Sequence, residues 1–190
     1  MPSVGQVEIR TQKRVLQLLQ DKLGYDYLGD WADEPDNRNI EVEYLQKWLE
    51  GQGIEAQLAT RAISELVKAS SDASKSLYDR NKAVYDLLRY GVKIKPGHGE
   101  NTVTIWLIDW QHWDKNHFAV AEEVTVKGAD AKAATKRPDI VIYVNGIALG
   151  VIELKRSSVS VLEGVYQNLD NQKKEFIQPF FTTQQWLMAG

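Results

Sequence analysis

The sequence predicts an α/β protein, with a mixed central sheet flanked by helices and preceded by an N-terminal helical region. Three observations support this fold class. Apolar residues recur at helical spacing through the first half, alternate at strand spacing after about residue 92, and form two β-branched runs around Asn145-Gly146. We expect one domain over residues 1–190, with a helical part at about 1–92 and a core at about 93–180.

Four amphipathic segments fill the first half, and a fifth lies near the end. Gly24 ends the first segment, and Gly51 and Gly53 close the second. We expect the apolar stripes of the first four segments to face the core, because a cofactor role for such stripes is rare. The stripes are Val15, Leu16, Leu18, Leu19 and Leu23; Ile40, Tyr44, Leu45, Trp48 and Leu49; Leu58, Ile63, Leu66 and Val67; Val84, Leu87 and Leu88; and Val161, Val165, Leu169 and Phe176.

Strand patterns dominate the second half. NTVTIWLIDW and HFAVAEEVTVKG alternate apolar and polar residues, and DIVIYVNGIALGVIELK reads as two central strands joined by the Asn-Gly hairpin signal. The apolar tail FFTTQQWLMAG indicates either a fragment of a longer chain or a last packed strand.

Composition excludes several classes of protein. The 190 residues contain no cysteine, so disulfides, thiolate metal sites and thiol nucleophiles are absent. No apolar run has the length of a membrane span or a signal peptide, so we expect a cytoplasmic protein without a membrane partner. The formal charge of −3 predicts weak DNA binding by this chain alone, so other domains or subunits would hold any DNA.

Three charged residues interrupt the apolar strands around the hairpin. Asp139 follows Arg137-Pro138, and Glu153 and Lys155 stand two apart on the second strand, so their side chains leave the same face. Burying such charges is costly unless they are paired or bind a metal. Two carboxylates and an ammonium on one face therefore indicate a Mg²⁺ site, with Asp139, Glu153 and the Leu154 carbonyl as ligands. Lys155 would orient the water that attacks a phosphate polarised by the metal. The alternative is a structural ion triad without metal.

The hairpin must have a particular register for these groups to converge. A plain two-residue turn would place Asp139 opposite Ile152, on the wrong face. We therefore expect a three-residue connection with Gly146 in the left-handed region; a bulge elsewhere on either strand would have the same effect.

The pattern Pro138-Asp139 followed by Glu153-Leu154-Lys155 resembles the PD-(D/E)xK nuclease motif. The stretch RPDIVIYVNGIALGVIELKRS resembles the N-terminal nuclease domain of the R subunit of type I restriction–modification enzymes. NRNIEVEYL, LYDRNKAVYDLLRYGVKI, FAVAEEVTVKG and QNLDNQKKEF extend the likeness over nearly the whole chain. The resemblance implies a PD-(D/E)xK fold and a Mg²⁺-dependent endonuclease cutting double-stranded DNA.

The resemblance also implies roles for further residues and partners. Asp139 and Glu153 would bind metal, Lys155 would be the catalytic lysine, and Gln167 matches the glutamine of a Gln-x-x-x-Tyr motif. Asn171 stands at the tyrosine position, which puts the second half of that motif in doubt. Specificity and methyltransferase subunits would recognise DNA. ATP would bind only motor domains absent from this chain, which has no Walker sequence.

Several residues and functions stay open. An early-helix glutamate often adds a ligand in the family, and the candidates are Glu8, Glu41, Glu43 and Glu65. Glu122 and Glu123 should face opposite ways, so at most one approaches the site. His98, His112 and His117 read as surface residues. The alternative functions are a docking module with an idle metal site and a self-sufficient repair or Holliday-junction nuclease.

Overall fold

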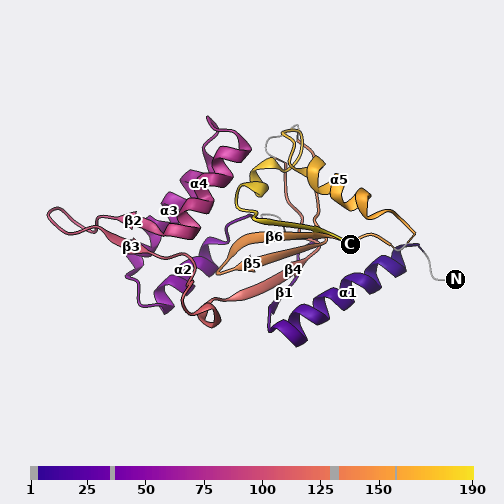
Figure 1. Ribbon diagram of the computed structural model, residues 1–190, viewed down its shortest axis with the longest axis horizontal. Coiled ribbons are helices and arrows are strands. Elements are labelled where there is room, and N and C mark those ends of the chain that lie inside the picture. The colour runs from indigo at the N-terminus through magenta and orange to yellow at the C-terminus, as the bar shows by residue number, and fades with distance from the viewer. Residues whose placement is uncertain (1–3, 35–36, 129–132, 157) are drawn as a thin grey trace.

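The computed structural model describes residues 4–34, 37–128, 133–156 and 158–190, with side chains from Ile9 onward. A five-stranded mixed sheet lies between helices, and a helical lobe adjoins one end of it (Figure 1). The sheet strands are β1 (Asp26–Asp30), β4 (Phe118–Glu122), β5 (Ile140–Val144), β6 (Ile147–Glu153) and β7 (Trp186–Ala189). The helices are α1 (Val4–Leu23), α2 (Val42–Gly51), α3 (Ala56–Ser71), α4 (Leu77–Tyr90) and α5 (Val161–Asn171).

The sheet has the order β1-β4-β5-β6-β7. The three central strands are antiparallel to one another, whereas β1 pairs with β4 and β7 pairs with β6 in parallel. The predicted mixed sheet with flanking helices is therefore confirmed. The tail forms a parallel edge strand, as one of the two interpretations expected.

The two faces of the sheet are covered by different elements. Leu16 and Leu19 of α1 pack on one face, and the segment around the short 3₁₀ helix η2 (Gln178–Thr182) packs on the other. Figure 1 shows α1 and α5 on opposite sides of the strands. Almost every residue of β5 and β6 is buried, and successive side chains pack on alternate faces of the sheet. The first face presents Val120, Ile140, Ile142, Ile152 and Leu154, and the second presents Ala119, Ala121, Val141, Tyr143 and Val151.

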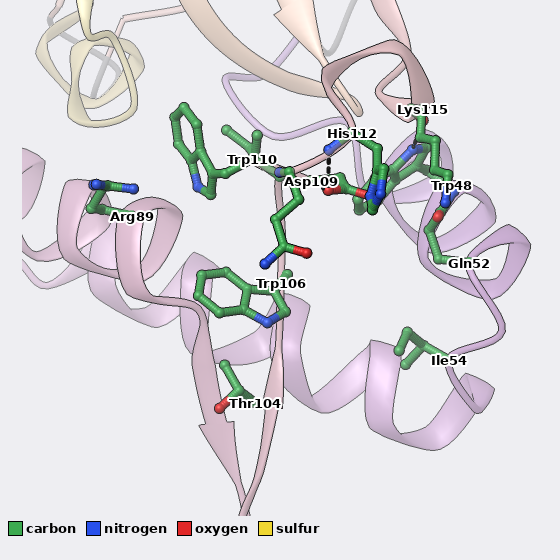
Figure 2. Close-up of a pocket in the computed structure, with 12 residues that line it drawn as sticks. Trp48, Gln52, Ile54, Arg89, Thr104, Trp106, Asp109, Trp110, His112 and Lys115 are labelled. Carbon is green, nitrogen blue, oxygen red and sulfur yellow. Dashed lines mark hydrogen bonds and ion pairs between the residues drawn. The ribbon is translucent and has the colours of Figure 1, made fainter.

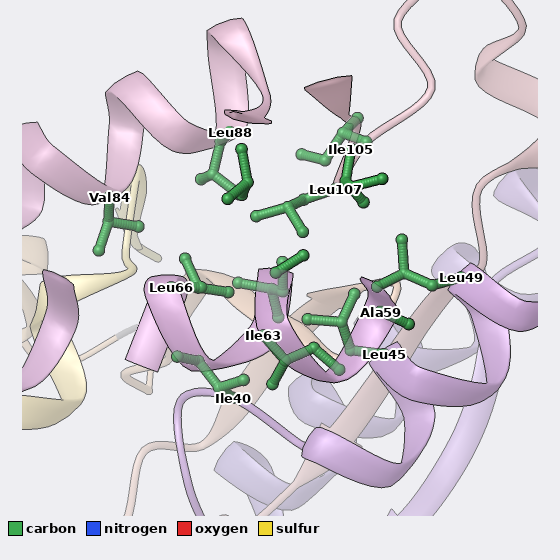
Figure 3. Packing of buried hydrophobic residues seen from close by; sticks show 14 of the residues in the cluster. Ile40, Leu45, Leu49, Ala59, Ile63, Leu66, Val84, Leu88, Ile105 and Leu107 are labelled. Carbon is green, nitrogen blue, oxygen red and sulfur yellow. The ribbon is translucent and has the colours of Figure 1, made fainter. Parts of the chain in front are cut away.

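The helical lobe consists of α2, α3, α4 and a small antiparallel sheet of β2 (Val92–Ile94) and β3 (Val103–Ile105). The Ser76 hydroxyl caps α4 by accepting a hydrogen bond from the Asp79 amide, and Gly91 ends the helix at φ +72°. Stripes from the second, third and fourth predicted helical segments meet in one apolar cluster, most of which is visible in Figure 3, whereas Leu16 and Leu19 of α1 pack on the sheet. The buried members of the cluster include Ile40, Leu45, Leu49, Ala59, Ile63, Leu66, Val84, Leu88, Ile105 and Leu107. Some members of the predicted stripes are exposed instead: Leu18, Leu23, Tyr44, Val67, Val161, Val165 and Leu169.

The β5–β6 hairpin joins this lobe to the sheet. Ile147 of β6 belongs to the lobe's apolar cluster, and the Glu41 amide, just before α2, donates to the Gly146 carbonyl. The buried side-chain amide of Asn145 donates through Nδ2 to the Leu107 carbonyl at 2.9 Å. The turn thus reverses the chain and also connects the sheet to the helical lobe.

The hairpin differs from the expected three-residue connection. Val144 pairs with Ile147, so the turn has two residues, Asn145 and Gly146, at φ 53° and 83°. Both are in the left-handed region, as the type I′ turn favoured by Asn-Gly requires. A bulge at Leu149 supplies the extra residue instead, because Tyr143 pairs with Ala148 and Ile142 pairs with Gly150.

Other boundaries also differ from the sequence patterns. β1 and β2 were not anticipated from the sequence. β4 ends at Glu122, where Glu123 adopts φ 52°, and Val126 makes only an isolated bridge to Lys136. No helix in the described part of the chain combines the length and apolarity needed to span a bilayer.

Candidate active site

Asp139 and Glu153 lie opposite each other at one end of the central hairpin. Ile140 pairs with Ile152, so the next pair outward is Asp139 with Glu153. Opposite residues of an antiparallel pair leave the same face, which here is the face carrying Val141 and Val151. The bulge therefore brings together the two carboxylates that a plain hairpin would separate. The Leu154 amide donates to Asp139 Oδ2 at 2.6 Å.

Two amides of α5 hold the Glu153 carboxylate, which is fully buried. Gln167 Nε2 donates to Oε2 at 2.5 Å, and Asn171 Nδ2 lies 3.5 Å from Oε1. Gln167 and Asn171 are one helical turn apart, so they share a face of α5. Asn171, at the position where the motif has tyrosine, is thus part of the site and contacts a predicted metal ligand.

Lys155 follows on the same face, and β7 fixes its backbone. The Lys155 amide donates to the Gly190 carbonyl at 2.5 Å, and the Gly190 amide donates to the Glu153 carbonyl at 3.0 Å. α5 can approach this segment because Gly164 faces it. A Cβ on Gly164 would lie 3.0 Å from Ala189 Cβ and 3.6 Å from Lys155 Cγ. Gly164 therefore lets the helix bring Gln167 to Glu153.

Electrostatics at Glu153 favour its neutral form. Burial raises the pKa of Glu153 to about 8, and the negative charges of Asp139 and Glu123 add to the increase. The Lys155 ammonium and the hydrogen bond from Gln167 act in the opposite direction. A cation placed between the two carboxylates would offset both the desolvation and the repulsion.

A second acidic group, Glu122 and Glu123, gathers around Gln12, a residue that the sequence did not single out. Gln12 of α1 donates to Glu122 Oε2 at 2.8 Å and to Glu123 Oε1 at 3.1 Å, so both carboxylates reach the same amide. The expectation that they face opposite ways was wrong, because the positive φ of Glu123 breaks the strand alternation. Arg137 pairs with Glu123 at 2.9 Å. The position of Gln12 on the buried face of α1 could have been inferred from the sequence, because the buried residues Leu16 and Leu19 follow it at i+4 and i+7.

The proposed early glutamates do not join this site in the described structure. Glu41 lies at the other end of the hairpin, where its amide bonds to Gly146, and Glu43 and Glu65 lie on α2 and α3 of the helical lobe. Glu8 lies in α1, but its side chain is outside the described residues.

The histidines are placed elsewhere on the molecule. His98 and His112 are exposed, as expected. His117 is half-buried and contacts Asp26 at 2.9 Å.

The donor atoms fit a hard cation with few protein ligands. Asp139 and Glu153 supply carboxylate oxygens, and the Leu154 carbonyl points to the same side of the strand as its amide, which bonds to Asp139. Within the described ranges, no three or more His, Asp or Glu side chains are gathered closely enough to hold an ion. Mg²⁺ tolerates such a sparse set because it retains several of its waters.

The fold and the acidic cluster define an α/β protein with a carboxylate pair, one member of it fully buried, and a lysine at one end of a mixed sheet. Residues 6–190 match the family model of the type I restriction enzyme R protein N terminus. The chain belongs to this family, and it is an R-subunit N-terminal region.

Curated relatives carry names consistent with this family. The HindI type I restriction enzyme endonuclease subunit of Haemophilus influenzae is 29% identical over 94% of this chain. A putative MjaIXP endonuclease subunit of Methanocaldococcus jannaschii is 35% identical over 40% of the chain. The aligned parts make up 18% and 8% of those two proteins, so this chain spans a small fraction of their length.

Proposed function

We propose that this chain is the Mg²⁺-dependent DNA-cleaving region of a type I restriction enzyme and has the PD-(D/E)xK nuclease fold. The observation that carries the proposal is the pairing of Asp139 with buried Glu153, two residues before Lys155. The names of the relatives, which are endonuclease subunits, support the same activity. The substrate is double-stranded DNA.

Each residue has a distinct part in this proposal. Asp139, Glu153 and the Leu154 carbonyl would hold the ion, which would supply positive charge to polarise the scissile phosphate and to activate a water for attack. Lys155 orients the attacking water and stabilises negative charge on the phosphate in the transition state. Gln167 and Asn171 fix the Glu153 carboxylate, as the surroundings of metal ligands commonly do.

The rest of the restriction complex supplies what this chain lacks. We place ATP binding and translocation in motor domains beyond this sequence, and DNA sequence recognition in specificity and methyltransferase subunits. The formal charge of −3 supports this division, since a protein that gripped the duplex by itself would need a basic surface.

A docking module is the second candidate function. The helical lobe motivates it, because α2, α3 and α4 build their own apolar cluster and lie at the end of the sheet away from Glu153 (Figure 1). In this alternative the lobe joins the motor to the methyltransferase core, and the carboxylate pair with Lys155 is a structural ion network.

One experiment separates the two functions. We expect Asp139→Ala and Lys155→Ala to reduce ATP-dependent cleavage of unmethylated plasmid by the reconstituted full-length complex about 100-fold or more, with ATP hydrolysis unchanged. Lys174→Ala, an exposed lysine beyond α5, is the matched control and should cut normally. Cleavage that survives both site substitutions would reject the nuclease site and favour docking.

A further inference from the structure

A cavity of about 580 Å³ lies in the helical lobe and shares no residue with the nuclease site. Three indole rings line it, those of Trp48, Trp106 and Trp110 (Figure 2). Trp106 and Trp110 are 48% and 51% exposed, so part of each ring is open to a ligand in the cavity. The volume lies within the range of about 300–1,000 Å³ typical of small-molecule pockets.

The walls of this tryptophan pocket are held in place by the fold. Trp48 Nε1 donates to the Lys115 carbonyl at 2.9 Å, and Trp110 Nε1 donates to the Leu88 carbonyl at 2.8 Å. Arg89 lies over the Trp110 ring, 5.6 Å from its centroid. The Trp48 and Trp110 rings, fixed in this way, shape the walls on either side of Trp106 and lose little conformational freedom when a ligand binds.

Charge and hydrogen-bonding groups narrow the class of ligand. Arg89 and Lys115 line the pocket as cations, and Asp109 is its one acidic lining residue among those described. The Asp109 carboxylate already accepts hydrogen bonds from the Gln111 and His112 amides at 3.0 and 2.9 Å. The pocket is therefore locally positive on a chain whose formal charge is −3. An anionic ligand with a planar aromatic part satisfies both features.

We propose that the tryptophan pocket binds a nucleotide, with the base stacked on Trp106 and the phosphate within reach of Arg89 or Lys115. Amides of Gln52 and Gln111 in the lining supply donors and acceptors for the edge of the base. Two sources share this chemistry: a free nucleotide and one nucleotide of a single DNA strand. Stacking on aromatic rings beside cations is how proteins commonly hold single strands.

The test is calorimetric titration of the native chain in EDTA, which excludes any metal-dependent reaction. The probes are adenosine and cytidine monophosphates, the matching nucleosides, and a short oligodeoxythymidylate. We expect nucleotides or the oligonucleotide to bind, nucleosides to bind more weakly, and Trp106→Ala to weaken binding about tenfold. Tighter binding of free nucleotides identifies a nucleotide site, and tighter binding of the oligonucleotide identifies a strand site.

Two further variants make the result decisive. Lys115→Gln changes an exposed side chain and should weaken the phosphate-bearing probes selectively. Trp113→Ala removes an indole that is 72% exposed and outside the lining, so it should bind like the native chain. Absence of binding at millimolar concentrations overturns the proposal, as does equal affinity of Trp106→Ala and Trp113→Ala. A Trp106→Ala chain that no longer assembles with the other subunits of the complex, from a native chain that binds no nucleotide, would assign the pocket to a protein partner. That outcome would also overturn the proposal.

Discussion

At the scale of single residues, burial decides the properties of the carboxylate pair. Glu153 is fully enclosed by the sheet and α5, whereas Asp139 before β5 is half-buried. The bulge at Leu149 sets them opposite each other, and the amides of Gln167 and Asn171 constrain the buried member. Burial of the Glu153 carboxyl thus raises its pKa well above the ordinary value of a glutamate.

The raised pKa of Glu153 predicts a pH-dependent stability for the metal-free chain. The folded state keeps its proton up to about pH 8, whereas the unfolded state ionises near pH 4.5. The unfolded state therefore binds fewer protons between these values, and the free energy of unfolding falls as pH rises through this window. Glu153→Gln removes the titration, so in EDTA it should be more stable than the native chain at pH 9, by on the order of 5 kcal/mol.

Urea denaturation at pH 4.5 and pH 9 measures this difference. Near pH 4.5 the two chains should differ little, because Glu153 is protonated in the folded state and still about half protonated in the unfolded state. Glu163→Gln, at an exposed glutamate on α5, controls for the loss of a surface charge. Because it keeps Glu153, its stability should fall between the two pH values about as much as that of the native chain. A native chain that gains stability between these pH values relative to Glu153→Gln would contradict the burial argument.

At the scale of elements, the Asn145-Gly146 turn does more than reverse the chain. A Cβ on Gly146 would lie 2.7 Å from Tyr44 Cβ and 2.8 Å from the Glu41 carbonyl oxygen. The start of α2 therefore packs directly on the turn, and glycine is required there for space as well as for its φ of +83°.

Gly146→Ala should destabilise the chain by about 3 kcal/mol, the sum of backbone strain and steric overlap. Gly99 has the same φ of +83°, and a Cβ added there would meet nothing within 4 Å, so Gly99→Ala isolates the backbone cost. That control should lose only about 1 kcal/mol. Denaturant midpoints measure both losses, and equal losses would show that α2 does not constrain the turn.

At the scale of the whole molecule, the sheet and the helical lobe are joined at two places. The hairpin turn packs into the lobe, and Asn81 of α4 donates to backbone carbonyls of the segment after η2, at 2.7 Å for Gln184. Arg80 of α4 also donates to Gln178 at 3.0 Å. These joints tie the lobe to the layer that covers the sheet.

We therefore expect the chain to unfold in one cooperative transition. Four of the six tryptophans belong to the helical lobe and its loops, so fluorescence reports mainly on the lobe, whereas far-ultraviolet circular dichroism reports on the whole chain. The two signals should give coincident urea transitions. A fluorescence transition that clearly precedes the circular dichroism transition would show instead that the lobe unfolds by itself.

The sequence determined the features that depend on local chemistry. Periodicity located the main helices, and Asn-Gly located the central hairpin. Asp139, Glu153 and Lys155 could be singled out because they are charged residues in otherwise apolar strands. Only the tertiary structure placed the bulge at Leu149 and brought Gln12 to the acidic residues after β4. It also assembled the tryptophan pocket. The reason is physical: turn and helix preferences act over a few neighbouring residues, whereas register and side-chain convergence depend on packing between segments far apart in the chain.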